Sequence, residues 1–439
     1  MTYLSTTCPL TGTLTIDGDK SISHRSVIFS GIASGTSTIK GLLLSEDVLA
    51  TKAAMEAMGV IYTQQEDGSY VVEGVGVNGL SQPQQTLDMG NTGTGVRLLM
   101  GLVASHDFTT SFTGDKSLCS RPMGRVLTPL SQCGLEVISS ADDYRLPITI
   151  KGSSTPAPIT YTLPVASAQV KSAILLAGLN IAGTTTVIEP VATRDHTERM
   201  LTGLGATITS QKDPATGHHV IALKGKQPLT HANFEVPADP SSAAFLIVAA
   251  LITEGSEVTI KNVCMNEGRT GLYTTLIEMG ATITYHNERV CAGESIADIT
   301  ASYSQLHGIE VPAERAPSMI DEYPILGVAA SVANGTTVMH GLEELKVKES
   351  NRLDATLNGL LACGVTAQAG EDTLTVTGGP IPGGCTITTH MDHRIAMSFL
   401  IAGLVSDSPI KVDDVTMIAT SFPNFFSLLE QLSIRVNES

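Results

Sequence analysis

Short runs of alternating apolar and polar residues, each followed by a longer stretch with helical spacing, recur along the chain and predict strands and helices in a fixed order. The recurring pattern is a strand, a turn rich in small or charged residues, and a helix. Its six copies begin at "LTIDGDKSISHR", "LDMGNTGTGVR", "YTLPVASAQVKSA", "FEVPADPSSAAF", "IEVPAERAPSMIDE" and "ITTHMDHRIAM". The copies start roughly 75 residues apart, which is longer than the common solenoid repeats.

A second marker follows each copy: a helix that ends at a glycine and is followed by a strand. It reads "MEAMGVIY", "LSQCGLEVI", "LTGLGATITS", "LIEMGATITY", "LLACGVTAQ" and, in a degenerate form, "LEQLSIRV". Glycine suits the position after a helix, where a left-handed backbone is needed. The glycines are Gly59, Gly134, Gly205, Gly280 and Gly364, and Ser433 replaces glycine in the sixth copy.

These patterns predict an α/β protein of six units, each with two helices and several strands. One unit is too small to bury both faces of its sheet, so we expect the units to pack in two groups of three. The 439 residues suffice for two or three domains. The linker-like stretch 225–240, "GKQPLTHANFEVPADP", is a candidate crossing between the groups.

Composition narrows the function. No apolar run is long enough to span a bilayer, and the N-terminus lacks a basic segment followed by an apolar one, so we expect a cytoplasmic protein. The seven cysteines are scattered without a C-x-x-C pair, which favours reduced thiols over disulfides or a zinc site. The formal charge of −17 and the absence of Trp argue against nucleic acid as a partner.

The six turns contain most of the unusual charged and polar residues. "GDKSISHR" is not a phosphate-binding P-loop, because Asp19 stands where that motif needs a glycine. A helix start with Lys20 and Arg25 can hold an anion, although a solvated basic cap is the alternative. If the turns of both groups face one another, several helix N-termini converge on one anion site. The turn residues are Lys20, Ser21, Arg25, Asn91, Gly93, Arg97, Ser167, Gln169, Asp239, Asp321, Asp392, His393 and Arg394.

Other loops add charged residues that suit carboxylate and phosphate groups. They are Arg121, Arg125, Arg194, Lys348, Glu349 and Arg352. Asp321 and Glu349 are candidates for proton transfer, with a structural salt bridge as the other interpretation. His390 and His393 have a metal-ligand spacing but lack a convincing third ligand. Cys119 is either a nucleophile activated by Arg121 or a cysteine that fills space.

The chain resembles a known family, 3-phosphoshikimate 1-carboxyvinyltransferase or EPSP synthase. The resemblance rests on eight ordered motifs: "GDKSISHR", "GNTGTGVR", "GDKSLCSRPM", "ASAQVKSA", "TRDHTE", "RAPSMIDEYP", "VKESNRL" and "DHRIAMSF". "ASAQVKSA" and "MIATSFP" resemble the subgroup that includes glyphosate-tolerant bacterial enzymes. The resemblance implies a two-domain fold of six βαβαββ units, an inside-out α/β barrel. It places residues 1–19 and 238–439 in domain I and residues 20–237 in domain II.

The resemblance also implies the reaction. The enolpyruvyl group of phosphoenolpyruvate passes to the 5-hydroxyl of shikimate 3-phosphate, and phosphate leaves. The two domains close over these substrates. No metal or organic cofactor, no nucleic acid and no membrane partner is expected, and the protein is expected to be a monomer that glyphosate inhibits.

Residue roles carry over by motif. Shikimate 3-phosphate is expected to contact Lys20, Ser21, Arg25, Ser167, Ala168, Gln169, Arg194, Asp321 and Lys348. Phosphoenolpyruvate is expected to contact Lys20, Gly93, Arg121, Gln169, Glu349, Arg352 and Arg394. Asp321 is expected to accept or orient the 5-hydroxyl proton, and Glu349, with Lys20, to protonate the methylene carbon.

Two positions depart from the pattern of many members. Ala168 replaces a serine that contacts phosphate, and Thr420 replaces a lysine that contacts phosphoenolpyruvate. Two other functions compete with the expected one. A sister enzyme transfers enolpyruvyl to UDP-N-acetylglucosamine through a loop with a reactive cysteine, and Cys119 lies in roughly that region. A non-catalytic anion-binding paralogue is the second alternative, against which the retained carboxylates and arginines argue.

Overall fold

The computed structural model describes residues 1–291 and 293–438, which divide into two compact units. Unit 1 comprises residues 1–17, 237–290 and 295–439, and unit 2 comprises residues 18–236 and 291–294. The chain therefore passes from unit 1 to unit 2 between Asp17 and Gly18 and returns between Val236 and Pro237, within the linker-like stretch, while the short segment 291–294 is again part of unit 2.

Unit 2 contains three four-stranded sheets. In the first, the strand order is β14 (Asn233–Glu235), β3 (Ser34–Lys40), β5 (Tyr70–Val75), β4 (Ile61–Gln64). In the second, it is β6 (Leu87–Asp88), β7 (Thr109–Thr113), β9 (Arg145–Lys151), β8 (Glu136–Ala141). In the third, it is β10 (Thr160–Thr162), β11 (Thr184–Glu189), β13 (His219–Lys224), β12 (Ile208–Lys212). The helices are α1 (Lys20–Ile32), α2 (Glu46–Ala57), α3 (Gly93–Val103), α4 (Lys116–Ser120), α5 (Gly124–Gln132), α6 (Ala168–Leu179), α7 (His196–Gly203) and the 3-10 turn η1 (Asp142–Tyr144).

Unit 1 repeats this arrangement with three more four-stranded sheets. Their strand orders are β16 (Thr282–Cys291), β17 (Glu294–Ser302), β15 (Glu257–Cys264), β2 (Thr11–Leu14); β18 (Glu310–Val311), β19 (Thr336–Met339), β21 (Leu374–Thr377), β20 (Thr366–Ala369); and β22 (Thr386–Ile387), β23 (Lys411–Val412), β1 (Thr2–Ser5), β24 (Arg435–Glu438). The helices are α8 (Pro240–Ile252), α9 (Gly271–Glu278), α10 (Ala316–Met319), α11 (Tyr323–Ser331), α12 (Arg352–Ala362), α13 (His393–Ala402), α14 (Phe425–Gln431) and the 3-10 turns η2 (Ala313–Arg315), η3 (Glu343–Val347) and η4 (Thr416–Thr420).

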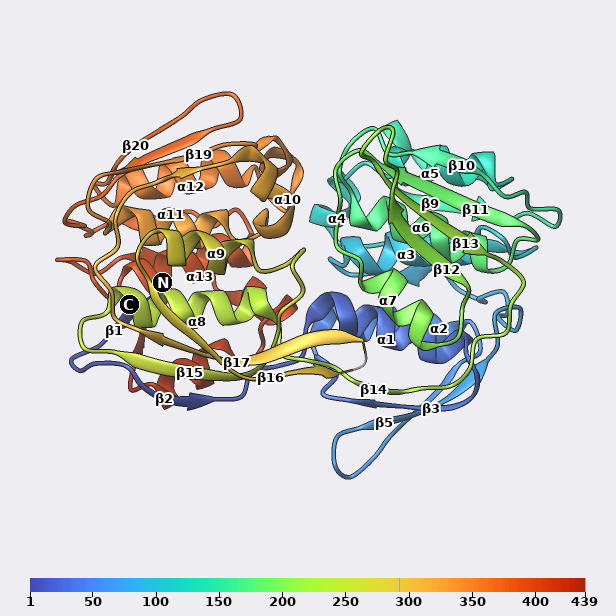
Figure 1. Cartoon of the computed structure of the whole chain (residues 1–439), viewed down its shortest axis with the longest axis horizontal. Helices are drawn as coiled ribbons and strands as arrows, with labels where there is room; N and C mark the ends of the chain where they lie inside the picture. Colours follow the sequence, from blue (N-terminus) through green and yellow to red (C-terminus); the bar gives the residue numbers. More distant parts are fainter. Residues whose placement is uncertain (292, 439) are drawn as a thin grey trace. The chain divides into compact units, whose positions relative to one another are not determined.

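The six sheets share one pairing pattern, which confirms the predicted six-fold repeat and the α/β class. In each sheet one edge strand pairs in parallel with its neighbour, as in β10 and β11, and the other described pairings are antiparallel. Three sheets join segments that are distant in sequence. β1 pairs with β24, β2 pairs with β15, and β3 pairs with β14 (Figure 1, where β2 is drawn beside β15 and β3 beside β14).

The first helix of each repeat forms the interior of its unit. In unit 2, α3 packs on α6 and α1, and in unit 1, α11 and α13 pack on α8 and on each other. Every residue of α8 is buried. A helix that is apolar on all sides is typical of a position with neighbours all round.

The glycine markers after the second helices adopt the predicted left-handed backbone. The φ angles of the five glycines lie between 82° and 105°. Ser433, which takes the place of glycine in the sixth repeat, also has a positive φ of 63°. The same turn geometry therefore forms in the sixth copy despite the side chain, at the energetic cost that a non-glycine residue carries there.

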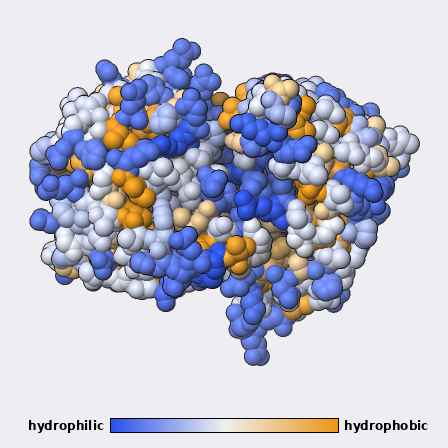
Figure 2. All heavy atoms as spheres, in the orientation of Figure 1, coloured by the Kyte–Doolittle hydropathy of each residue, from blue (hydrophilic) through white to orange (hydrophobic). Residues whose placement is uncertain are grey.

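The surface of each unit is mostly hydrophilic on the face that Figure 2 shows, with single apolar residues scattered over it. Among the described residues, the exposed large apolar side chains come from many different segments. None of the helices that the structure describes is long and apolar enough to cross a membrane.

Candidate active site

The N-terminal turns of α1, α3 and α6 meet in unit 2. His24 of α1 lies 3.4 Å from the hydroxyl of Thr92, the residue that caps α3. The amide oxygen of Gln169 in α6 accepts a hydrogen bond of 3.0 Å from Arg97 in α3, and its amide nitrogen donates to Thr94 at 3.0 Å. Three helix starts that are about 75 residues apart in sequence thus form one polar cluster.

Side chains cap each of these three helices. Asp19 accepts from the N–H of Ile22 at 2.7 Å, Thr92 from that of Gly95 at 3.0 Å, and Ser167 from that of Val170 at 3.4 Å. Each cap satisfies one of the free N–H groups of a helix start. The partial positive charge of the helix start remains and favours an anion nearby.

Lys20, Ser21 and Arg25 lie on the first two turns of α1, as the motif "GDKSISHR" predicts. Lys20 forms an ion pair of 2.5 Å with Asp47, a residue of α2. The guanidinium of the buried Arg25 donates to Ser172, Thr197 and the carbonyl of Ser21 at 2.8, 2.8 and 3.0 Å. These three neutral partners fix the guanidinium of Arg25 in one orientation.

His24 is buried between these cations. Its Nδ1 lies 2.8 Å from the hydroxyl of Thr51. Burial first, and then the charges of Lys20 and Arg25, lower its pKa well below the ordinary value of 6.5. His24 is therefore neutral at pH 7, so it does not add a third positive charge to this cluster.

Gly93 and Arg121 lie together at the start of α3. A Cβ atom on Gly93 would be 2.8 Å from Nη1 of Arg121 and 2.9 Å from Nη1 of Arg97. Arg121 donates to the amide oxygen of Asn91 at 2.9 Å and to the hydroxyl of Ser117 at 3.3 Å. Two guanidinium groups thus approach the backbone at a position where glycine leaves room for them.

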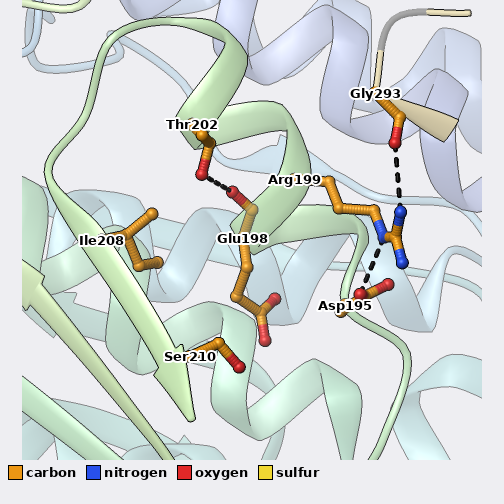
Figure 3. A pocket seen from close by; sticks show the side chains of 7 residues that line it. All are labelled: Asp195, Glu198, Arg199, Thr202, Ile208, Ser210 and Gly293. Carbon is orange, nitrogen blue, oxygen red and sulfur yellow. Dashed lines mark hydrogen bonds and ion pairs between the residues drawn. The ribbon is translucent and has the colours of Figure 1, made fainter.

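Arg194 precedes α7, whose surroundings are strongly charged. His196 is completely buried, and its Nδ1 lies 2.7 Å from the carboxylate of Glu294. Arg199 donates to Asp195 at 2.7 Å and to the carbonyl of Gly293 at 3.2 Å, beside a cavity of about 310 Å³ (Figure 3). The residues that line this cavity include none that we assign to a substrate.

A buried triad of charged residues links α6, β11 and α7. Lys171 is 1% exposed and contacts the carboxylates of Glu189 and Glu198 at 3.0 and 2.7 Å. Burial opposes its charge, but the two carboxylates outweigh burial and raise the pKa of Lys171. Its ammonium also donates to the carbonyl of Thr193 at 3.4 Å, which ties the residue before Arg194 to α6.

Unit 1 shows a corresponding convergence of α8, α11 and α13. Glu322, at the N-terminus of α11, contacts Ser241 in the first turn of α8 and Arg394 in the first turn of α13, the latter at 3.3 Å. Asp239 caps α8 and forms an ion pair of 3.1 Å with the buried Arg269. The fifth repeat has a break between α10 and α11, in which Asp321 is half-buried and Glu322 is buried.

Arg352, the first residue of α12, lies among three carboxylates. It contacts Asp392 at 2.8 Å, Asp321 at 3.0 Å, and Glu349 directly. Burial alone would lower the pKa of this 1% exposed guanidinium, but the three carboxylates outweigh burial and raise it. Arg352 in turn keeps the pKa of Asp392 below its ordinary value, against the opposing effect of burial.

Lys348 and Arg394 complete this cluster. The ammonium of Lys348 lies 3.3 Å from the carboxylate of Asp321, and Arg394 donates to the carbonyl of Asp321 at 3.2 Å. Thr420 is buried in η4, and its hydroxyl donates to the carbonyl of Met417 at 2.7 Å. Asp321 therefore has three cationic side chains around it, while Glu349 is one residue from Lys348 in the chain.

The predicted residues thus form two clusters, one in each unit. The unit 2 cluster holds Lys20, Ser21, Arg25, Gly93, Arg121, Ser167, Ala168 and Gln169, together with Arg194 in the turn before α7. The unit 1 cluster holds Asp321, Lys348, Glu349, Arg352 and Arg394. Helix starts converge within each unit. A single site that joins both clusters stays a prediction.

Other candidates lie outside these contacts. His390 is exposed with a positive φ, and the structure shows no group of three or more possible metal ligands among its described residues. Cys119 of α4 donates to the carbonyl of Gly114, which precedes the helix, at 3.3 Å. Sequence reasoning missed Asp47, Ser172, Thr197 and Lys171. Three of these residues lie in the motifs "ASAQVKSA" and "TRDHTE", so their place in a motif was a signal from which they could have been found. Asp47 carried none.

Comparison with known proteins identifies the family. The family model described as EPSP synthase (3-phosphoshikimate 1-carboxyvinyltransferase) matches residues 4–429. The chain belongs to the EPSP synthase family. It is 55% identical over 432 residues to 3-phosphoshikimate 1-carboxyvinyltransferase from Chelativorans sp. (strain BNC1), covering 98% of this chain and 96% of that protein. The enzyme of the same name from Pseudomonas sp. (strain PG2982) is also 55% identical, over 433 residues, with the same coverage.

Solved structures agree with the sequence comparison. The EPSP synthase from Acinetobacter baumannii superimposes with a TM-score of 0.87 at 42% identity, and all of both chains is covered. The expected enolpyruvyl transferase fold is therefore confirmed. The expected EPSP synthase family is confirmed with it, in preference to the sister enzyme.

Proposed function

We propose how the residues of this chain carry out the EPSP synthase reaction of the shikimate pathway, which leads to chorismate and the aromatic amino acids. The observation that carries the function is the match of residues 4–429 to the EPSP synthase family, with 55% identity to enzymes of that name. The reaction transfers the enolpyruvyl group of phosphoenolpyruvate to the 5-hydroxyl of shikimate 3-phosphate and releases phosphate. The substrates are two anions, which suits two clusters built on helix starts and arginines.

Shikimate 3-phosphate is assigned to residues of both units. Arg25 holds the shikimate carboxylate, and its hydrogen bonds to Ser172 and Thr197 support this role because they fix the guanidinium in advance. The phosphate is held at the start of α6 and by the loop before α7. The residues assigned chiefly to the phosphate are Ser167, Gln169 and Arg194 in unit 2, and Lys348 in unit 1. Lys20 lies between the two substrates, and Ser21 and Ala168 are further contacts of shikimate 3-phosphate. The replacement of serine by Ala168 leaves the phosphate one hydroxyl fewer.

Phosphoenolpyruvate is assigned to an arginine clamp. Arg121 and Gln169, with Lys20 and the backbone at Gly93, form the part in unit 2. Arg352 and Arg394, with Glu349, form the part in unit 1. The contacts of Arg352 with Glu349 and of Arg394 with Glu322 support this role, because an incoming carboxylate or phosphate can take the place of these acidic partners.

Asp321 and Glu349 transfer protons. Asp321 accepts the proton of the 5-hydroxyl as that oxygen attacks phosphoenolpyruvate, and the two cations beside Asp321 stabilise its carboxylate form. Glu349, with Lys20, donates a proton to the methylene carbon, which gives a tetrahedral intermediate. Removal of a proton from the resulting methyl group, with loss of phosphate, yields the product.

Phosphate release by the purified protein tests this function. With shikimate 3-phosphate and phosphoenolpyruvate together we expect stoichiometric phosphate and enolpyruvyl product, and with either substrate omitted we expect none. Phosphate release with UDP-N-acetylglucosamine in place of shikimate 3-phosphate would contradict the proposal. A Cys119→Ser variant with unchanged turnover separates the two reactions further, since the sister enzyme depends on a reactive cysteine.

Further properties belong to the same proposal. We assign residues 1–19 with 238–439 and residues 20–237 to the two functional domains of the enzyme. The enzyme acts as a monomer in the cytoplasm, needs no cofactor, and is inhibited by glyphosate in competition with phosphoenolpyruvate. Gly93 is the residue on which the glyphosate proposal depends.

A further inference from the structure

Two cysteines of unit 1 lie side by side although 22 positions separate them in the sequence. The Sγ atoms of Cys363 and Cys385 are 3.5 Å apart. Both are free thiols. The scattered spacing of the cysteines predicts no such pair, because only the folding of the chain between α12 and β22 brings the two together.

The backbone holds both residues in place. Cys363 is the C-terminal cap of α12, and its carbonyl accepts a hydrogen bond of 3.1 Å from the N–H of Gly383. The carbonyl of Cys385 accepts one of 3.0 Å from Lys411, the first residue of β23. These hydrogen bonds hold the main chain of each cysteine in place. Little further ordering is therefore needed to join the two thiols.

The two sulfurs differ in access to solvent. Cys363 is 1% exposed, whereas Cys385 is half-buried against the core of unit 1. Burial, followed by the neighbouring Cys385, raises the pKa of the Cys363 thiol. A small oxidant therefore reaches Cys385 first, and Cys363 is the partner that resolves the product.

We propose that Cys363 and Cys385 are an oxidisable pair, a covalent modification site at which a peroxide converts two thiols into a disulfide. In the first step, the sulfur of Cys385 attacks one peroxide oxygen, the O–O bond breaks, and a sulfenic acid and water form. In the second, the sulfur of Cys363 attacks the sulfenic sulfur, the S–O bond breaks, and the thiol proton leaves with the oxygen as a second water. The thiols lose two electrons, and hydrogen peroxide gains them.

The cross-link acts on stability and not on the substrate clusters. It closes a loop of 22 residues that includes β20 and β21, and so restricts the unfolded chain. It lies at the C-terminal end of α12, whereas Arg352 is at the N-terminal end. A helix of 11 residues is about 16 Å long, so the guanidinium cluster is remote from the sulfurs.

Cys133 is a matched control within the same chain. It caps α5 before Gly134, as Cys363 caps α12 before Gly364, and it is also buried. Burial raises the pKa of Cys133 to about 11. The two cysteines occupy the same place in two repeats, and they differ in that Cys363 has Cys385 beside it.

The experiment treats the full-length protein with one equivalent of hydrogen peroxide, alkylates the remaining thiols and maps the peptides by mass spectrometry. We expect a peptide that links Cys363 to Cys385, about 2 Da lighter than the two thiol peptides together. We also expect the thermal midpoint to rise by roughly 5–10 °C, with turnover within about twofold of the untreated enzyme and reversal by a thiol reductant. Cys133→Ser should respond like the wild type, and Cys385→Ser should show no rise.

Three results would overturn the proposal. One is full alkylation of both cysteines after oxidation, and another is a disulfide that joins either of them to a different cysteine. The third is conversion of Cys385 to the sulfinic acid, about 32 Da heavier than the thiol, with Cys363 still reduced. The wild-type peptide map decides between these results even if the serine variants do not fold.

Discussion

The carboxylate of Glu349 contacts the guanidinium of Arg352, which also contacts the carboxylates of two other residues. Exchange of the Glu349 carboxylate for an amide therefore leaves Arg352 with two acidic partners, and it tests the role of Glu349 in proton transfer. Glu349→Gln keeps the shape of the side chain but removes the proton that we assign to the methylene carbon. General acids and bases contribute on the order of 10²–10⁴-fold to rate. We therefore expect turnover to fall by this factor while the dissociation constant of shikimate 3-phosphate changes little.

Stopped-flow turnover and equilibrium titration measure the two quantities. The control is Glu343→Gln, an exposed glutamate in the preceding 3-10 turn. The control should leave both quantities unchanged. If Glu349→Gln stayed within about threefold of the wild-type turnover, Glu349 would have no part in proton transfer.

We propose that Gly93 determines how much room an inhibitor has beside Arg121. A methyl group here would lie 2.8 and 2.9 Å from the ends of Arg121 and Arg97, so both flexible side chains must shift slightly. Glyphosate is longer than phosphoenolpyruvate and reaches the methyl group first. One extra methyl group in a close-packed pocket costs about 1–3 kcal/mol, or roughly 10- to 200-fold in affinity.

We expect Gly93→Ala to raise the inhibition constant of glyphosate by this factor, and the Michaelis constant of phosphoenolpyruvate by much less. Inhibition assays in competition with phosphoenolpyruvate, on both proteins side by side, measure this. Equal inhibition constants would show that Gly93 does not control access. A wild type that resists millimolar glyphosate would contradict the proposed sensitivity and would point to Thr420, where many relatives have lysine.

His24 makes the stability of unit 2 depend on pH. Its pKa in the folded state is well below 6.5, whereas the unfolded residue takes up a proton near that value. As pH falls below 6.5, only the unfolded state gains the proton, so unfolding becomes more favourable. The loss reaches about 1.4 kcal/mol at pH 5.5 if the folded histidine stays neutral there.

Urea unfolding between pH 7.5 and 5.5 measures this loss, with His24→Gln as the comparison. Glutamine does not titrate, so the free energy of unfolding of the variant should depend less on pH by about that amount. The explanation fails if His24→Gln retains the full wild-type slope.

At the scale of elements, Lys171 connects α6, β11 and α7 through a buried charge triad. Lys171→Met preserves the approximate volume but leaves the carboxylates of Glu189 and Glu198 without their buried cation. Breaking a buried ion pair in this way costs about 3–5 kcal/mol. We expect unfolding of unit 2 at a correspondingly lower denaturant concentration.

Lys52→Met is the matched control for this prediction. Lys52 pairs with Glu56 at 2.7 Å within α2, where the two side chains are 17% and 39% exposed, and its ammonium lies over the rings of Tyr62 and Tyr70. This pair is more accessible than the triad, and solvated pairs contribute about 0–1 kcal/mol. Denaturant titrations should therefore separate the two variants clearly. Equal stabilities of the two variants would mean that the triad contributes no more than a surface ion pair.

The repeated elements could be predicted because their signals are local. A turn followed by an apolar helix, or a helix that ends at glycine, can be recognised from about a dozen neighbouring residues. Ser433 also adopts the left-handed backbone of this turn. The pairing of β1 with β24 has no local signal, because its residues lie at opposite ends of the chain. The break at Asp321 was equally hidden, since the sequence there predicts one helix start.

The candidate site divides in the same way. Residues that meet an anion are charged and stand in turns, so the motifs containing Arg25, Arg121 and Arg352 were found. The residues that hold them are neutral or acidic partners from other elements, such as Thr197 for Arg25 and Asp47 for Lys20. Such pairings depend on tertiary structure, and a sequence without it cannot reveal them.

At the scale of the whole molecule, the proposed ligands of shikimate 3-phosphate are divided between the two units. Arg25 and Gln169 belong to unit 2, and Asp321 and Lys348 belong to unit 1. A ligand that gains its full interaction energy only when both sets contact it favours whichever arrangement of the units allows this. We therefore expect saturating shikimate 3-phosphate to lower the radius of gyration of the protein in solution.

Small-angle X-ray scattering with and without the substrate measures this change. Inorganic phosphate is the control ligand, because it offers the anion without the ring that must reach Asp321, and it should leave the radius unchanged. Lys348→Met should weaken both the binding of shikimate 3-phosphate and the compaction, since it removes a proposed contact from unit 1 alone. An unchanged radius at saturation would mean that one unit binds this substrate by itself, and the assignment of Asp321 and Lys348 to it would then be wrong.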